Sequence, residues 1–302
     1  MLEAVARRVR GAMGRGPGPA ILLYHRVAES PPDPFGLCVS PRHFDEHLAI
    51  VARRRRPMPL PALVAAARAG EAPADAIAIT FDDGYRDNLD TALPLLERHG
   101  IPATFLIASG QVGARRGFWW DELERAVLRT ATGAPRREAF QELYAMLIGL
   151  DAARREPMLG ELLEAAGMPL TAPDRDRALT ADELATLAAS PLARIGAHTV
   201  SHPSLPQLSR AEQLREMRES RTGLEAIVGA PVTSFAYPYG DHDDTSVATA
   251  RETGFGIGLT CVARNVEPGA DPLRLPRIEI HDCDGEGFER GLRRGHFARE
   301  AA

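Results

Sequence analysis

Seven short apolar runs recur along the chain, and most of them end in polar residues or in a turn. The runs cover residues 20–23, 76–81, 103–108, 193–197, 232–237, 255–261 and 275–280. Segments with helical patterning lie between them, such as 41–56, 87–100, 209–229 and 243–254. Strands that alternate with helices favour a mostly parallel sheet, and seven strands in a chain of this length fit a closed barrel better than an open sheet. We therefore expect an α/β fold, namely a distorted (β/α) barrel of seven or eight strands.

Two segments fall outside this alternation. Residues 117–187 contain no strand candidate and predict a helical insertion between two barrel strands. The insertion begins with Trp119 and Trp120, for which packing is the preferred interpretation and a wall for a sugar substrate is the alternative. Residues 1–19 are expected to be an N-terminal extension, and residues 20–302 a single barrel domain.

Composition excludes several classes of partner. A formal net charge of −5 argues against a nucleic-acid partner. No stretch approaches the roughly 20 apolar residues of a membrane span, and the N-terminus lacks the apolar core of a signal peptide. Three widely spaced cysteines predict neither a disulfide framework nor a zinc knuckle. We expect a cytoplasmic location, with the basic residues 1–15 as a frayed helix; peripheral association with the inner membrane is the alternative.

Two adjacent carboxylates, Asp82 and Asp83, follow the second apolar run. Gly84 lets the chain turn there, so that both carboxylates can reach one cleft. Like charges this close are unfavourable unless a cation or a proton separates their roles. One solution places one carboxylate on a metal and leaves the other as a general base. The alternative is an Asp-Asp-Gly turn that caps the following helix.

Two histidines, His198 and His202, follow the fourth run at a spacing of four residues. This spacing places two imidazoles on one side of a helical turn, and Pro203 then prevents a regular helix. The spacing is weak evidence by itself, since two surface histidines would also satisfy it. Together with Asp83 the pair offers two nitrogens and one oxygen, which is the ligand pattern of a catalytic zinc site with one position left for water.

These motifs resemble those of the polysaccharide deacetylase family, the carbohydrate esterases of family 4 that contain the chitooligosaccharide-deacetylase domain. The stretches that carry the resemblance are ITFDDGYRDN, LPLLERHGIPATFLI, GAHTVSHPSLPQLS and FAYPYG, within residues 20–110 and 180–282. The resemblance implies a distorted (β/α) barrel, a divalent metal that is usually zinc, and hydrolysis of N-acetyl or O-acetyl groups on glycans. It implies that Asp82 is the general base that deprotonates water, and that Asp83, His198 and His202 hold the metal.

The resemblance also assigns the turn after the fifth run. In FAYPYG, Tyr239 is expected to supply a backbone N–H to the oxyanion hole, with Pro238 and Tyr237 beside it in the substrate site. The alternative for this turn is simply the end of a strand.

Two positions depart from the family pattern. Many members carry an arginine just after the Phe of the third motif to orient the base, where this chain has Ala236. Arg277 is the candidate replacement. Many members also carry a late Leu-X-His motif whose histidine protonates the leaving amine. Here the last run reads LPRIEI, and His281 follows one residue too far along the chain.

An early histidine is the candidate for the vacant acid role. The first strand of a barrel ends on the same face as the other strands, so His25 can reach the site. The subset that resembles bacterial exopolysaccharide deacetylases has a Tyr-His pair at this place, and this chain has Tyr24-His25. An ordinary His pKa near ~6.5 suits proton donation near neutrality. We assign His25 as general acid; a buried structural histidine is the alternative.

The preferred function is therefore a metal-dependent hydrolase that removes acetyl groups from an N-acetylated saccharide, such as an N-acetylglucosamine oligomer, a polysaccharide or a lipid-linked glycan. The metal is expected to be Zn²⁺, although cobalt and nickel suit the same ligands. One alternative is an amidohydrolase acting on a non-sugar amide. Another is a glycan-binding protein with a non-catalytic site, against which the intact Asp82, Asp83, His198 and His202 argue. The sequence does not define the oligomeric state.

Overall fold

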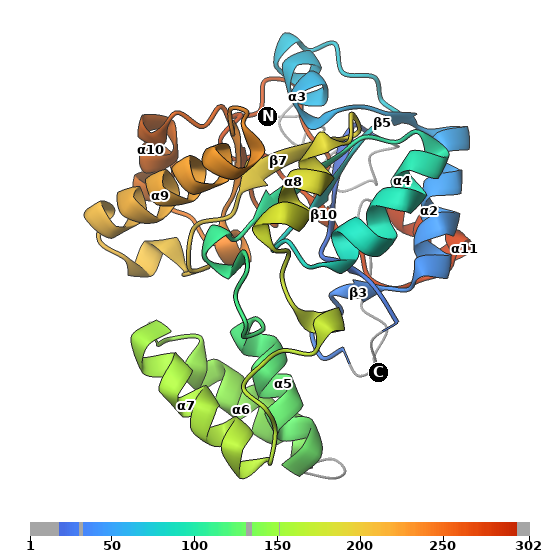
Figure 1. Cartoon of the computed structure of the whole chain (residues 1–302). Helices are drawn as coiled ribbons and strands as arrows, with labels where there is room; N and C mark the ends of the chain where they lie inside the picture. The colour runs from blue at the N-terminus through green and yellow to red at the C-terminus, as the bar shows by residue number, and fades with distance from the viewer. Residues whose placement is uncertain (1–17, 30–32, 131–134, 151, 295–302) are drawn as a thin grey trace, which may run out of the picture.

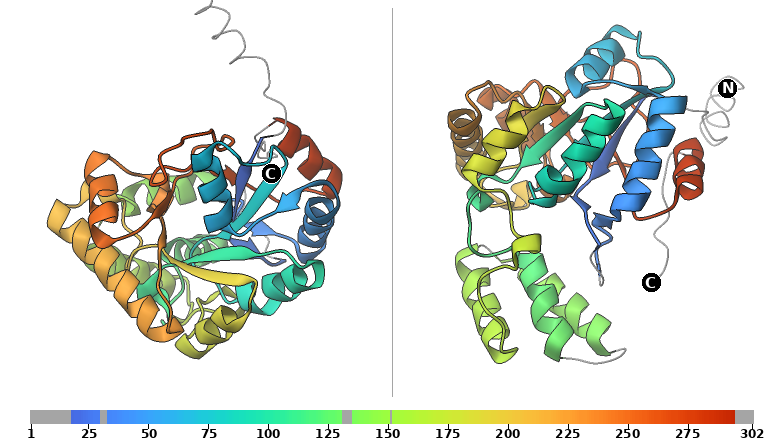
Figure 2. Two further views of the ribbon diagram at one scale, coloured as in Figure 1. Left: turned by 90° about the horizontal axis from the view of Figure 1, so that it is seen from above. Right: turned by 45° about the vertical axis from the view of Figure 1, so that its right-hand side comes forward.

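A curled parallel sheet forms the centre of the computed structural model, which describes residues 18–29, 33–130, 135–150 and 152–294 (Figures 1 and 2). Its strands are β1 (Ala20–Tyr24), β4 (Arg56–Pro57), β5 (Ala76–Phe81), β6 (Ala103–Ile107), β7 (Ala193–Ala197), β8 (Ser234–Ala236), β9 (Ile257–Leu259) and β10 (Ile278–Glu279). Their order is β10-β1-β5-β6-β7-β8-β9, with β4 paired to β5, and all of these pairs are parallel. Each of the seven predicted runs overlaps one of these strands, and the predicted barrel class is confirmed.

The two edges of the curled sheet are joined by the chain that leads into β10. Leu275 pairs in parallel with Leu259 at the β9 edge, and its N–H donates to the Gly258 carbonyl at 2.8 Å. Three residues later, Ile278 pairs with Leu22 of β1. This short crossing completes the distorted barrel and carries Arg277 between the two edges.

Helices cover the outside of the sheet (Figure 1). They are α2 (Pro41–Arg54), α4 (Leu93–His99), α8 (Ala181–Ala189), α9 (Arg210–Val228), α10 (Asp244–Thr253) and α11 (Gly285–Arg294). The helix α3 (Leu60–Ala69) instead packs against the interior face of the sheet, in a core cluster with Ile21, Ala78 and Leu106. The ends of α9 follow from local sequence, because Ser209 and Glu212 form a capping box and Gly229 adopts a left-handed conformation at the C-terminus. In the described part of the chain no helix is long and apolar enough to cross a membrane.

Three further helices gather at one end of the molecule, away from the helices around the sheet (Figures 1 and 2). They are α5 (Trp119–Thr130), α6 (Pro135–Leu147) and α7 (Ala152–Ala165), and we call them the α5–α7 segment. All three fall within the predicted insertion 117–187. In the same range, however, α8 contacts β7 and α9 and belongs to the layer around the sheet. Of the predicted extension 1–19, residues 1–17 lie outside the described residues.

Strand alternation on β5 determines which side chains enter the barrel. Ile77, Ile79 and Phe81 belong to the large core cluster under the helices. Thr80 lies on the opposite face, and its hydroxyl donates to the Leu22 carbonyl at 2.7 Å. Asp82 continues the line of Thr80 at the carboxyl end of the strand, so the sheet directs its carboxylate toward the barrel interior.

Candidate active site

Three loops at the carboxyl ends of the strands have unusual backbone conformations. Within the described residues, the non-glycine residues with positive φ are Asp83 (75°), Thr199 (64°), His202 (56°) and Tyr239 (60°). These residues follow β5, β7 and β8. Side chains adopt this region rarely, and such strain concentrates at functional sites. The conformation of Asp83 turns the chain directly after β5, which brings its side chain near that of Asp82.

The predicted metal ligands meet in one buried cluster. The Nε2 atoms of His198 and His202 lie 3.1 Å apart. Asp83 Oδ1 lies 3.5 Å from His202 Nε2 and 3.7 Å from His198 Nε2. His198 Nδ1 donates to the Ala236 carbonyl at 2.8 Å, so its Nε2 carries the lone pair that faces the cluster. The arrangement has the ligand types of a three-residue zinc site.

The charges within this cluster are not balanced by protein groups. Asp83 Oδ1 is buried and has no hydrogen-bond partner in the described part of the chain. Burial and then the charge of Asp82 raise the pKa of Asp83 well above its usual value. Burial lowers the pKa of His198, and burial together with His198 lowers that of His202 well below the usual value. Neutral imidazoles around a buried carboxylate that lacks a partner fit a divalent cation.

Asp82 lies in a different electrostatic environment. Arg277 pairs with it in a bidentate manner, with Nη1 2.6 Å from Oδ1 and Nη2 2.7 Å from Oδ2. Burial raises the pKa of Asp82, but the charges of Arg277 and His198 outweigh this effect and lower it to about 2. Arg277 is itself fully buried, and its Nε donates to the Thr260 carbonyl at 3.0 Å. Asp82 is therefore ionised and fixed at 3.8 Å from His198 Nε2.

The two candidate acids have different surroundings. Burial lowers the pKa of His25 below its usual value, and the charges of Asp82 and Glu279 offset only part of this effect. His25 also contributes to the shifted pKa values of Asp82, His198 and His202, so its imidazole belongs to the same electrostatic group. The Nδ1 atom of His281, in contrast, lies 3.0 Å from the Gly36 carbonyl oxygen.

The FAYPYG turn places its two tyrosines in different environments. The Tyr239 ring lies 4.6 Å from that of His202, and its hydroxyl accepts a hydrogen bond from Trp119. Tyr237 is fully buried, and its hydroxyl donates to the Leu273 carbonyl at 2.9 Å. The Tyr237 side chain is part of the core, so it is the backbone of this residue that lies beside the predicted substrate site. Pro238 is buried within the turn.

Two residues that support the histidine loop were missed from the sequence. Glu216 on α9 accepts hydrogen bonds from the backbone N–H groups of Val200 and Ser201 at 2.8 and 2.9 Å. Thr199 Oγ1 accepts the His202 N–H at 3.0 Å. A glutamate in the middle of a helix carries no signal that it faces a loop 15 residues earlier.

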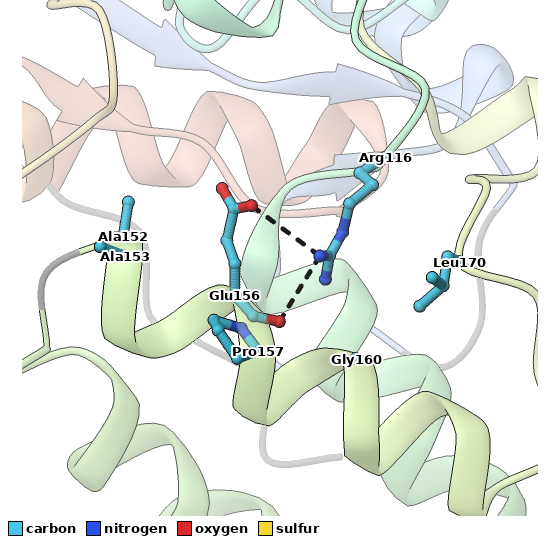
Figure 3. A pocket seen from close by; sticks show the side chains of 7 residues that line it. All are labelled: Arg116, Ala152, Ala153, Glu156, Pro157, Gly160 and Leu170. Carbon is cyan, nitrogen blue, oxygen red and sulfur yellow. Dashed lines mark hydrogen bonds and ion pairs between the residues drawn. The ribbon is translucent and has the colours of Figure 1, made fainter.

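Two hollows lie beside the α5–α7 segment. A pocket of about 250 Å³ is lined by His202 and Ser201 and by Trp119, Trp120 and Arg155 of this segment. A larger groove of about 510 Å³ lies next to it along α7, where Arg116 faces the Glu156 carboxylate at 3.8 Å (Figure 3). None of the predicted site residues lines the larger groove. Trp119 and Trp120 are only 7% and 5% exposed, which favours packing over a sugar-stacking surface.

Comparisons with solved structures agree with this fold. Streptococcus pyogenes deacetylase PplD, solved in complex with acetate, is similar with a TM-score of 0.64 at 20% identity, over 92% of this chain and 99% of that chain. IcaB from Ammonifex degensii is similar with a TM-score of 0.64 at 20% identity, over 93% of this chain and 98% of that chain. At this level of identity the likeness shows a shared fold.

Sequence comparison identifies the family. The Bacillus subtilis (strain 168) protein YxkH, described provisionally as a polysaccharide deacetylase, is 22% identical over 194 residues, which are 64% of this chain and 46% of YxkH. The chain thus spans about half the length of this curated relative. Residues 69–258 match the polysaccharide deacetylase family, and this range contains both aspartates, both histidines and the FAYPYG turn. The chain therefore belongs to the polysaccharide deacetylase family.

Proposed function

We propose that the protein is a metal-dependent deacetylase that removes acetyl groups from an N-acetylated saccharide. The observation that carries the proposal is the buried cluster of Asp83, His198 and His202 beside an ionised Asp82. Two nitrogens and one oxygen favour zinc among the divalent cations, although cobalt and nickel suit the same ligands. A cation held there would make water more acidic and would polarise the acetyl carbonyl.

The residues around this cluster have the chemistry that hydrolysis of an amide needs. Asp82 accepts a proton from the attacking water, and Arg277 holds its carboxylate in one orientation. The backbone N–H of Tyr239 donates to the oxygen that becomes negative as water adds to the carbonyl carbon. His25 donates a proton to the leaving nitrogen as the C–N bond breaks. The products are acetate and a free amine.

The test combines metal binding with acetate release on N-acetylglucosamine oligomers. We expect one zinc per chain, acetate release that a chelator abolishes, and recovery on adding zinc. Asp82→Asn keeps the size of the side chain but removes the base, so we expect a loss of roughly 10²–10⁴-fold with zinc binding retained. Full activity in Asp82→Asn would refute the assigned base. Stoichiometric zinc without hydrolysis of any acetylated glycan would refute the proposed reaction.

A further inference from the structure

We propose that α5 is a positioning element of the active site, in which Trp119 and Trp120 hold the three loops that carry Asp83, His202 and Tyr239. The inference rests on the proposed function in assigning those loops to metal binding and catalysis. It concerns the α5–α7 segment, which lies apart from the sheet whose loops carry the predicted metal ligands (Figure 1).

Trp120 contacts both loops that carry metal ligands. Its Nε1–H donates to the Tyr85 hydroxyl at 2.8 Å, and Tyr85 is a fully buried residue two positions after Asp83. On the other side, the Trp120 ring lies 4.9 Å from the His202 ring at an angle of 58°. One side chain from α5 therefore connects the loop after β5 to the loop after β7.

Trp119 contacts the third loop. Its Nε1–H donates to the Tyr239 hydroxyl at 3.2 Å. The Trp119 ring is stacked on Tyr144 of α6 at 5.1 Å, and the Arg155 guanidinium of α7 lies 4.8 Å from its centre. The neighbouring helices thus fix Trp119, and Trp119 in turn fixes the side chain of Tyr239.

The orientation of His202 shows why these contacts are needed. A metal-binding histidine is normally oriented by a hydrogen bond to its second ring nitrogen. His198 has such a bond to the Ala236 carbonyl, whereas His202 Nδ1 is buried and has no hydrogen-bond partner in the described part of the chain. The rings of Trp120 and Tyr239, at 4.9 and 4.6 Å, pack against His202 instead. Packing by Trp120 of α5, and by Tyr239 that Trp119 holds, therefore takes the place of the missing hydrogen bond.

Backbone conformation supports the same conclusion. Asp83, His202 and Tyr239 all adopt left-handed conformations, which are unfavourable for residues with a side chain. Such conformations persist only when surrounding contacts over-determine them. Each of the three loops has a direct contact with Trp119 or Trp120, so α5 supplies a contact of this kind to all three.

Zinc affinity of the metal-free full-length chain, measured by competition with a chromophoric chelator, tests the proposal without relying on activity. Trp120→Leu removes both the ring and the N–H, and we expect zinc affinity to fall by roughly 10–100-fold. Trp120→Phe removes only the N–H and should give a smaller loss. Trp119→Phe should lower zinc affinity less than Trp120→Leu does, because it reaches His202 only through Tyr239. It should lower kcat more than it changes KM, because it releases Tyr239.

A matched control separates positioning from general destabilisation. Leu163→Ala cuts a fully buried side chain of α7, so it should lower the melting temperature without changing zinc affinity. If Trp120→Leu and Trp120→Phe bind zinc as tightly as the wild type, the positioning role is overturned. The same holds if Leu163→Ala weakens zinc binding as much as Trp120→Leu does. A wild-type chain that binds no zinc would instead count against the proposed function.

Discussion

Asp82 and Asp83 are adjacent in the sequence, yet the two sides of the site that they face are stabilised by different interactions. On the Asp82 side, Arg277 supplies a bidentate partner from within the barrel, and the pKa of Asp82 is lowered to about 2. On the Asp83 side, burial and the charge of Asp82 raise the pKa of Asp83, and one of its oxygens has no hydrogen-bond partner in the described residues.

The protein itself balances the charge on the Asp82 side, whereas the Asp83 side needs a cation. The Asp82 side is electrostatically complete and depends on a protein ion pair. The Asp83 side consists of neutral histidines, a destabilised carboxylate and aromatic packing from α5, and a cation would complete it. The two sides should therefore respond differently to mutation, to metal and to pH.

Breaking the ion pair on the Asp82 side should have the largest effect on stability. Arg277→Met leaves the buried charge of Asp82 without a partner, and we expect a loss of about 3–5 kcal/mol in the free energy of unfolding. Adding Asp82→Asn should restore most of this loss, because it removes the unpaired charge. Denaturant titrations of the two single variants and the double variant measure this coupling. A loss in Arg277→Met that the second substitution does not reduce would show that Arg277 acts mainly through packing.

Removing the acid should have the next largest effect, and it should depend on the leaving group. His25→Ala should slow hydrolysis of an N-acetyl amide by at least about 10²-fold, since the amine must be protonated as it leaves. The aryl oxide of an activated aryl acetate leaves without being protonated, so the rate of hydrolysis of this ester should change little. Steady-state kinetics on both substrates give the ratio of the loss on the amide to the loss on the aryl acetate.

His281→Ala is the control for this measurement, because His281 Nδ1 lies beside the Gly36 carbonyl. We expect it to leave both rates unchanged. A loss that is selective for the amide in His281→Ala but absent in His25→Ala would move the acid role to His281.

The sequence predicted the parts of this site that follow from topology. Parallel strands bring their carboxyl ends to one face, so Asp83, His198 and His202 could be grouped from the places where the apolar runs end. Arg277 was also predicted as the partner of Asp82, because Ala236 occupies the position at which many family members carry the arginine that orients the base. α3 was not predicted, and neither was the short strand β4.

The remaining contacts could not be predicted because they depend on which surfaces meet. Trp119 and Tyr239 are 120 residues apart, and neither residue carries a signal for the other. Most of α8 lies within the predicted insertion, but this helix packs on β7, with Leu184 and Leu187 buried. An apolar helix face shows that a partner exists without identifying it. The motif also gave no indication that Tyr237 points into the core.

A substitution of Asp83 should stabilise the metal-free protein but abolish its response to zinc. The pKa of Asp83 in the fold lies above its unfolded value, so the ionised carboxylate destabilises the metal-free fold at neutral pH. Asp83→Asn should therefore raise the free energy of unfolding of the metal-free protein, because it removes the carboxyl group whose ionisation burial and the charge of Asp82 disfavour. It should also abolish stabilisation by zinc. Thermal melts with and without zinc compare the two proteins, and a metal-free Asp83→Asn that is less stable than the wild type would contradict this view.

The smallest expected effect is a pH dependence that again distinguishes the two sides. On α5, burial raises the pKa of Asp121 to about 7 and that of Glu124 to about 8, and the charges of Asp33 and Asp176 add to both shifts against the opposing charge of Arg26. Tyr85, which accepts the Trp120 hydrogen bond, donates to Asp121 at 2.9 Å. Both folded pKa values exceed the unfolded values near ~4. The stability that protonated Asp121 and Glu124 contribute is therefore complete in acid and is lost as pH rises through about 7–8.

The Asp82 pair behaves in the opposite way, since its folded pKa of about 2 lies below the unfolded value and its contribution is lost only in strong acid. Melting temperatures from pH 5 to pH 9 should therefore fall by a few degrees in the wild type and fall less in Asp121→Asn with Glu124→Gln. Arg277→Met should keep the alkaline decline, because its partner lies on the other side of the site. If the double variant declines as steeply as the wild type, the alkaline sensitivity arises outside α5, and the contrast between the two sides would then rest on the metal alone.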